Sequence, residues 1–508
     1  MTETPYDLTI IGSGAGGGTL AYALADWGKK ILLLEQGPYL PKSTDNWSPE
    51  AVFHHSRYKT KEKWLDIQDN PFSPGMNYYL GGNTKVYGAV LTRLRKRDFE
   101  NIQHLGGLSP EWPISYEDLE PYYSTAENIY NVHGVQNEDP TDPRETEFPL
   151  PPISHEPYID DLSESFKKLG LNPYHLPLGI NLDEQNPRAG KCVRCKTCDG
   201  FPCLLDAKSD AAVNAVEPAL KQGNVTLIRN AKVLRLNTSS SGREISSIDT
   251  EIDGEKRSFK SNIVVVSCGA AKSAELLLRS ANESHPEGLS NSSGQVGRNY
   301  MAHNNAFLMA VKPGKPNTAV FQKTLGINDF YFNDKSGKYP LGNIQLVGKL
   351  QKGMLTAEKP WVPSPILGYL ADHSVDWWIM TEDLPHPDNR VTLTSRGDLK
   401  LSLKQTNTQA HKELIQTFSS LMRDIGYPLI LSQILGAETC SHQVGTIKFG
   451  HDPKNSVLNE FCQSHDIHNL FVVDGSFFPS SSAMNPALTI MAQALRTGDW
   501  IRNNYENL

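Results

Sequence analysis

Long apolar runs are missing from the 508-residue chain. A membrane-spanning helix needs roughly 18 or more consecutive apolar residues, and the apolar stretches here are shorter and interrupted. The sequence therefore predicts no transmembrane segment. Its first predicted strand begins by about residue 6, which leaves no room for a cleavable signal peptide, so we expect a cytoplasmic protein.

Positive charge and cysteine are also scarce. The chain has 49 basic and 57 acidic residues, a net charge of −8, and no basic block, which makes a nucleic-acid partner improbable. Its seven cysteines would stay mostly reduced in the cytoplasm. The length exceeds what one simple core needs and indicates two or three domains.

The first 35 residues read as strand, glycine turn, helix and strand. The segment IIGSGAGGGT carries Gly12, Gly14 and Gly17, and the second strand, ILLLE, ends on Glu35, 18 residues after Gly17. In such a βαβ unit Gly12 permits the tight turn, Gly14 lets the backbone approach a pyrophosphate, and Gly17 lets helix and strand pack closely. The acid suits the hydroxyls of an adenosine ribose, so the pattern predicts dinucleotide binding and disfavours NADP.

Further segments typical of a nucleotide-binding α/β fold follow along the chain. A second glycine turn lies at 79–94, a pair of strands at 224–236, a buried strand and helix at 263–281, and a final strand and helix in the last 40 residues. Short strand-like runs between 302 and 402 look antiparallel. We therefore expect an α/β fold with a discontinuous Rossmann-like domain (1–100, 190–301 and 436–508). An antiparallel-sheet substrate domain (101–189 and 302–435) would be inserted into it.

Two C-terminal segments carry the candidate chemistry. One is SHQVGTIKFG with His442, and the other is VVDGSFFPSSSAMNPALT with Asp474, Gly475, Asn485 and Pro486. A helix that starts at Asn485–Pro486 would aim its positive N-terminus at the nucleotide cleft. That end suits a flavin, whose pyrimidine edge becomes anionic on reduction, better than a nicotinamide, which becomes neutral.

These motifs, with GGNTKVYG after the first unit and VVVSCGA in the middle, resemble the glucose–methanol–choline (GMC) flavoprotein oxidoreductases from the first strand to the last helix. The resemblance implies FAD as cofactor and oxidation of an alcohol to a carbonyl. Some members tether the flavin through a histidine shortly after the double glycine; here Lys85, Val86 and Tyr87 stand there, which implies non-covalent FAD. The implied cofactor-binding residues are Gly12, Gly14, Ala15, Gly17, Glu35, Gly82, Asn83, Val233, Asp474, Gly475, Asn485 and Pro486.

The catalytic residues implied by the resemblance are His442, as the base that takes the hydroxyl proton, and Asn485, which orients the substrate oxygen. Asn485 could instead cap the last helix. Of the adjacent Trp377 and Trp378, at most one can line a pocket, and sheet packing is the favoured interpretation for either.

The substrate expected from the resemblance is a sugar or glycoside. The alternatives are a lipophilic alcohol, such as a sterol or long-chain alcohol, and a flavin-containing lyase. No motif specifies the electron acceptor, and oxygen, a quinone and a protein all stay open.

Four cysteines crowd into one short segment, CVRCKTCDGFPC, as Cys192, Cys195, Cys198 and Cys203. An iron–sulfur cluster, a zinc site, disulfides and reduced thiols in a packed turn are all compatible with this spacing. We favour a structural loop near the active site, without bound metal and without a redox role of its own.

Overall fold

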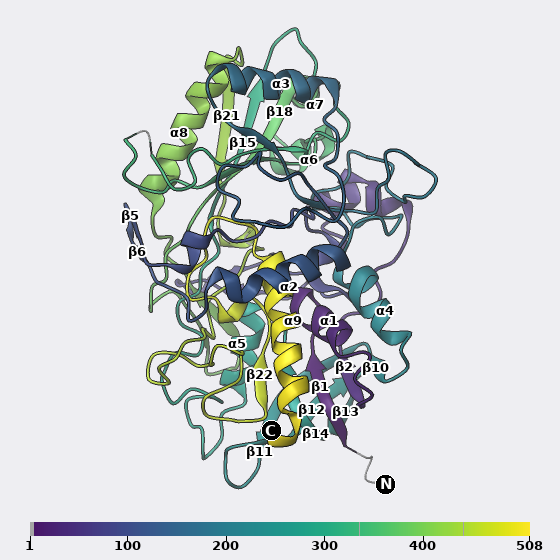
Figure 1. Cartoon of the computed structure of the whole chain (residues 1–508), viewed down its shortest axis with the longest axis vertical. Coiled ribbons are helices and arrows are strands. Elements are labelled where there is room, and N and C mark those ends of the chain that lie inside the picture. Colours follow the sequence, from purple (N-terminus) through teal and green to yellow (C-terminus); the bar gives the residue numbers. More distant parts are fainter. Residues whose placement is uncertain (1–4, 335, 440) are drawn as a thin grey trace.

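The computed structural model describes residues 5–334, 336–439 and 441–508. Its architecture is α/β, with a parallel sheet in the lower half of Figure 1 and a large antiparallel sheet in the upper half. The expected combination of a Rossmann-like sheet with an antiparallel sheet is confirmed.

The parallel sheet contains five strands in the order β10-β2-β1-β14-β22. Four of its strands, β2, β1, β14 and β22, are mostly buried and rich in Ile, Leu and Val, as expected where both faces of a sheet are covered, whereas the edge strand β10 is only partly buried. In the register, Ile10 of the first strand lies opposite Leu33 on one side and Val265 on the other. The strands are β1 (Tyr6–Ile11), β2 (Ile31–Leu34), β10 (Val225–Ile228), β14 (Ser261–Val266) and β22 (Leu470–Val472).

Helices from opposite ends of the chain cover this sheet. The first helix follows the glycine turn, and it packs against the C-terminal helix, which runs beside it in Figure 1. Leu20 of the first helix and Leu24, which caps its C-terminal end, share one apolar core with Met491 and Leu495 of the last helix. The helices of this half are α1 (Ala15–Ala23), α4 (Glu217–Leu220), α5 (Ala270–Arg279) and α9 (Ala487–Asn504).

Smaller sheets extend this half. The expected strand pair at 224–236 does form two strands, but they belong to different sheets: β10 joins the parallel sheet, whereas β11 starts an antiparallel β11-β12-β13 sheet. A second small sheet, β19-β20-β3-β4, packs on α5. The strands are β3 (Trp64–Leu65), β4 (Pro71–Phe72), β11 (Ala231–Thr238), β12 (Ile245–Ile252), β13 (Glu255–Phe259), β19 (Arg390–Leu393) and β20 (Leu399–Ser402).

The large antiparallel sheet has six strands in the order β21-β15-β18-β17-β16-β8. Trp377 is fully buried behind it, between the rings of Phe166 and Phe418, and anchors a second core. Its elements are β8 (Pro173–His175), β15 (Asn304–Val311), β16 (Leu325–Ile327), β17 (Asn343–Leu346), β18 (Ser374–Thr381), β21 (Leu429–Ile434), α3 (Pro157–Lys168) and α8 (Thr408–Asp424).

The remaining elements lie around and between the two halves. Helix α2 crosses between them in Figure 1 and begins with a capping box between Ser115 and Asp118. Nowhere in the described ranges is a helix long and apolar enough to cross a membrane. These elements are α2 (Tyr116–Ile129), α6 (Lys352–Glu358), α7 (Ser364–His373), β5 (Ile102–His104), β6 (Gly107–Ser109), β7 (Val132–His133), β9 (Leu178–Gly179) and the short helical turns η1 (Thr44–Trp47), η2 (Glu50–His54), η3 (Gly82–Lys85), η4 (Lys96–Phe99), η5 (Ala212–Val216), η6 (Ala437–Thr439), η7 (Gly475–Phe477) and η8 (Tyr505–Asn507).

Candidate active site

A cavity of about 520 Å³ lies between the two main sheets. Ligand pockets of open α/β sheets form at the carboxyl ends of the strands, and the segments that follow β1, β2, β14 and β22 all line this cavity. The opposite wall comes from the antiparallel sheet, through Phe307 of β15, Gln345 of β17 and Trp378 of β18. The cavity has the size of a small-molecule or cofactor site.

The turn between β1 and α1 forms one end of the cavity. Gly12 has φ +103° there, and a Cβ on it would lie 2.2 Å from the carbonyl oxygen of Ser267, so only glycine fits. A Cβ on Gly14, by contrast, would have no protein atom within 4 Å. The backbone at Gly14 is therefore open to the cavity, as close approach of a pyrophosphate requires. The neighbouring Ala15 also lines the cavity.

Glu35 lies at the end of β2, buried in the same wall. Its carboxylate accepts hydrogen bonds from the amide and hydroxyl of Ser13, at 3.1 and 2.5 Å, and from the amide of Gly37 at 2.8 Å. Burial raises the pKa of Glu35 above its usual value, and these donors counteract the shift. The side chain is thus held in place beside the cavity, where the predicted ribose contact requires it, and Val233 of β11 lines the same region.

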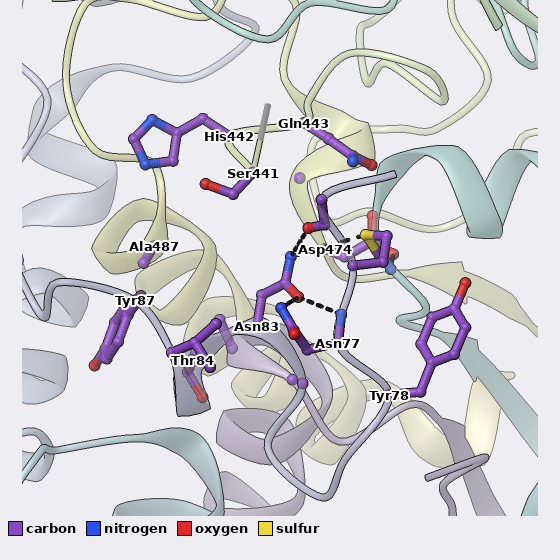
Figure 2. A pocket seen from close by; sticks show the side chains of 18 of the residues that line it. Asn77, Tyr78, Asn83, Thr84, Tyr87, Ser441, His442, Gln443, Asp474 and Ala487 are labelled. Carbon is purple, nitrogen blue, oxygen red and sulfur yellow. Dashed lines mark hydrogen bonds between the residues drawn. The ribbon is translucent and has the colours of Figure 1, made fainter. Parts of the chain in front are cut away.

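The second glycine turn forms the cavity floor. Asn83 accepts from the backbone amide of Asn77 at 2.9 Å and donates to the carbonyl of Gly75 at 3.1 Å. Its side chain therefore fastens the 75–77 loop, which the sequence did not indicate as part of the site. Figure 2 shows this asparagine pair on one side of the pocket, with Ser441 and His442 on the other.

Asp474 lies shortly after β22, and four hydrogen bonds fix its carboxylate. One carboxylate oxygen accepts from the amide of Gly269 at 2.9 Å and from the Ser273 hydroxyl, and the other accepts from the amide and hydroxyl of Ser476. Burial raises the pKa of Asp474, while these donors favour the ionised form. The carboxylate joins the turns after β14 and β22, and Gly475 lines the cavity beside it.

His442 and Asn485 line the same cavity from separate segments. Burial, with a smaller contribution from the neighbouring His303, lowers the pKa of His442 to about 3. Its imidazole is therefore neutral near neutral pH, the form that can accept a proton. Its Nδ1 lies 3.1 Å from Nδ1 of His303.

The start of the last helix differs slightly from the prediction. Helix α9 begins at Ala487, and Pro486 occupies the N-cap position, one residue before the expected first helical position. Asn485 is therefore not the cap, and of the described side chains its Oδ1 is one of the buried atoms without a hydrogen-bond partner. This Oδ1 can therefore accept a hydrogen bond from a bound molecule. The first turn of α9 reaches the cavity through Ala487 and Ile490.

Sequence reasoning missed three residues of this site. Trp378 lines the cavity, so the expectation of sheet packing was wrong for this tryptophan and right for Trp377. Gln345 lies opposite Trp378 on the neighbouring strand and also lines the cavity. His303 precedes β15 and contacts His442. A lone histidine and a strand glutamine carry no signal of their own, because only the tertiary packing brings the glutamine to the cavity and the histidine to His442.

The cysteine segment lies beside the cavity, which Asp199 and Gly200 line. Cys192, Cys195, Cys198 and Cys203 are all free thiols in the structure, and burial raises the pKa of Cys192 to about 12. Two buried lysines hold the loop: Lys208 donates to the carbonyls of Cys198 and Phe201, and Lys323 pairs with Asp199 at 2.6 Å. The structural role of this segment, without metal, stays a prediction.

The cavity fits FAD on two counts. The open backbone at Gly14 suits a pyrophosphate, and the positive end of α9 suits the electron-rich edge of a flavin.

Comparison with known proteins agrees with this geometry. GMC oxidoreductase domains match residues 69–305 and 430–494. A 6'''-hydroxyparomomycin C oxidase of Streptomyces lividus is 29% identical over 97% of this chain and 90% of its own length. A 2-methyl-1,2-propanediol dehydrogenase of Mycolicibacterium austroafricanum is 28% identical over 99% of this chain and 96% of its own length.

The fold is also that of solved flavoenzyme structures. Pyridoxine 4-oxidase from Mesorbium loti superposes with a TM-score of 0.67 at 16% identity, over 98% of this chain and 99% of the other. An Aspergillus oryzae formate oxidase, whose FAD is named in its description, gives a TM-score of 0.68 at 16% identity over the whole of both chains. From the two family domains, the relatives that match it end to end and a cavity that fits FAD, the chain belongs to the GMC oxidoreductases and is an FAD-dependent enzyme that oxidises alcohols.

Proposed function

We propose that this enzyme oxidises a hydroxyl group of a sugar or glycoside to a carbonyl. The observation that carries the proposal is a pair of acceptors in the cavity wall. Of the described side chains, Gln345 Oε1 and Asn485 Oδ1 are buried and have no hydrogen-bond partner, and both residues line the cavity.

Buried acceptors of this kind favour a substrate with several hydroxyl groups. Leaving a buried polar atom unpaired costs about 1–3 kcal/mol, which a bound hydroxyl donor recovers. A sugar can donate to Asn485 and Gln345 together, whereas a simple lipophilic alcohol has one hydroxyl for both. The cavity therefore selects for a polyol more than for a long alkyl chain.

An aromatic wall complements these acceptors. Trp378 packs edge-to-face on Phe307 with ring centroids 4.7 Å apart, and its indole N–H donates to Asn305 at 2.9 Å. The indole is thereby fixed in orientation and has no free donor, so it offers the cavity its apolar surface. The C–H face of a sugar ring suits such a surface.

His442 and Asn485 would act on the reacting hydroxyl. The neutral imidazole of His442 accepts the hydroxyl proton, and Asn485 donates to the same oxygen and holds it in position. Bound FAD supplies the acceptor for the carbinol hydride. The residues that would hold the cofactor all line the cavity: Gly12, Gly14, Ala15, Glu35, Gly82, Asn83, Val233, Asp474, Gly475, Asn485 and Pro486. Gly17 supports the turn from within helix α1.

The substrates in the names of several relatives support this choice. Besides the paromomycin enzyme, they include a paromamine 6'-oxidase of Streptomyces fradiae, 29% identical, and a fructose dehydrogenase large subunit of Gluconobacter japonicus, 25% identical. The proposal also includes non-covalent FAD, a cytoplasmic location and the two-domain boundaries expected above. We propose no electron acceptor.

Anaerobic titration of the FAD-loaded enzyme tests the substrate class. Hexoses, methyl glycosides and paromamine should bleach the visible flavin bands, whereas 1-dodecanol and cholesterol in detergent should not. Bleaching by the lipophilic alcohols alone would overturn the proposal, and turnover without bleaching would indicate a lyase.

A substitution in the cavity wall sharpens this test. Gln345→Leu should lower the second-order rate constant of flavin reduction by the sugar roughly 5- to 10-fold, the equivalent of one lost hydrogen bond. The same constant for a small mono-alcohol serves as the control and should stay unchanged. Equal losses for both would mean that Gln345 shapes the cavity without binding the sugar.

A further inference from the structure

We propose that His303 is a positioning residue, which holds His442 in the tautomer whose Nδ1 carries the proton and whose Nε2 is the free base. The inference rests on the proposed role of His442 as the base of the reaction. His303 directly precedes β15, and the two imidazoles meet edge-to-face, with centroids 5.1 Å apart.

The direction of each hydrogen bond follows from its ends. His303 Nε2 lies 3.1 Å from the carbonyl oxygen of Ser481, and a carbonyl can only accept. Nε2 of His303 therefore carries a hydrogen. Burial lowers the pKa of His303, so the ring is neutral and its Nδ1 is an acceptor.

The second hydrogen bond then has one possible donor. His303 Nδ1 and His442 Nδ1 lie 3.1 Å apart, and since the former accepts, the latter must donate. A neutral His442 with hydrogen on Nδ1 has its lone pair on Nε2. Ser481 thus determines, through His303, which nitrogen of His442 can take a proton.

Ser481, the last residue in this series of hydrogen bonds, is itself held in place. Ser481 is fully buried, and its hydroxyl donates to the backbone carbonyl of Asp383 at 2.9 Å. His303 is 1% exposed and has φ +53°, an unfavourable conformation for a residue that serves only to fill space. Besides His442, the titratable group that acts on His303 is Glu382, which pairs with His104 at 3.0 Å.

The arrangement has a consequence for the reaction. When Nε2 of His442 accepts the hydroxyl proton, its Nδ1–H can keep its bond to His303, and no second proton has to move. The developing imidazolium is stabilised by an acceptor already in place. His303 itself stays neutral and touches neither the substrate nor the base nitrogen.

Two substitutions separate this role from packing. His303→Asn keeps an acceptor close to the position of Nδ1 and is well suited to positive φ, whereas His303→Leu is similar in volume to histidine and has no polar atom in its side chain. The measurements are ¹⁵N NMR of histidine-labelled protein, with the His442 signals assigned through His442→Gln, and the anaerobic rate of flavin reduction.

In the wild-type protein we expect the His442 ring as the Nδ1–H tautomer, and the same in His303→Asn. In His303→Leu the ring should become a mixture of tautomers, and flavin reduction should slow roughly 10- to 100-fold, with most of the rate restored by Asn. An Nε2–H tautomer in the wild type, or unchanged tautomer and rate in His303→Leu, would overturn the inference. The NMR result needs no turnover, so it stands apart from the role of His442 as base, which His442→Ala tests through the rate.

Discussion

Gly82 of the second glycine turn packs directly on Gly14 of the first: a Cβ on Gly82 would lie 3.3 Å from the Cα of Gly14. The two turns are far apart in sequence, and their contact closes the end of the cavity around the open backbone of the β1–α1 turn. The proposed nucleotide site is therefore built by two glycine turns together.

This geometry predicts different effects for two glycine substitutions. Gly14→Ala adds a methyl group that meets no protein atom within 4 Å, so the melting temperature of the apoprotein should be unchanged while FAD affinity falls at least roughly tenfold, about 1.4 kcal/mol. Gly17→Ala places its Cβ 2.0 Å from the carbonyl of Gly12 and should lower the melting temperature itself. Calorimetry measures the melting temperature of each variant, and FAD titration measures its affinity for the cofactor. Full FAD affinity in Gly14→Ala would exclude the pyrophosphate from this turn.

The rate of flavin reduction should depend little on pH between 5 and 8. The pKa of His442 is lowered to about 3, so the neutral base is present throughout this range, and protonation would remove it only at lower pH. An exposed histidine would instead lose the rate below about pH 6.5. Stopped-flow reduction at saturating substrate measures the profile, with an unchanged flavin spectrum as the control for folding. A fall centred near pH 6.5 would contradict a neutral, partly buried His442 as the proposed base.

Asn485→Asp should slow flavin reduction, because a carboxylate at this position repels both a substrate alkoxide and the electron-rich edge of the flavin. Asn485→Ser, which retains a smaller donor, is the comparison and should be less impaired. Stopped-flow rates at several substrate concentrations separate binding from reduction. An Asp variant as fast as the wild type would remove Asn485 from the reaction.

Acid precipitation should release FAD into the supernatant. Val86 lines the cavity at the turn where some family members carry a tethering histidine, and valine forms no bond to a flavin. Visible absorbance of the supernatant and pellet gives the result directly. Flavin that stays with the precipitated protein would show a covalent bond from another residue.

The cysteine segment should contain no metal. Lys208 and Lys323 already hold the loop through its carbonyls and Asp199, so the fold does not need an ion there. Elemental analysis of the yellow protein should find neither iron nor zinc in stoichiometric amount, and substrate should still reduce the flavin fully. Iron together with a broad visible shoulder would establish a cluster.

The parallel half of the fold could be predicted because its signals are local. Glycine spacing, buried strand runs and the acid at Glu35 each depend on a few consecutive residues, and the βαβ unit formed where expected. The resemblance to the GMC family was carried by such segments and by their order along the chain. FAD as cofactor and alcohol oxidation as the reaction followed from that resemblance. The assignments of His442 and Asn485 to the reaction stay predictions.

Other features depend on contacts between distant segments, which no local pattern contains. Trp377 and Trp378 are equivalent in the sequence, and only the register of β18 sends one to the core and the other to the cavity, beside Gln345. Asn485 loses the cap position because the helix begins one residue later than expected, and its Oδ1 has no hydrogen-bond partner among the described residues.

The sequence by itself thus determined the family of this protein, its FAD cofactor and the class of its reaction, because these follow from short, contiguous motifs. The tertiary structure alone decided how His442, the proposed base, is held. Hydrogen bonds from His442 to His303, and from His303 to the carbonyl of Ser481, join three segments whose proximity arises only when the sheets pack together. Such a chain of directed hydrogen bonds depends on angles and distances of a few ångströms, which residue types and spacings do not specify.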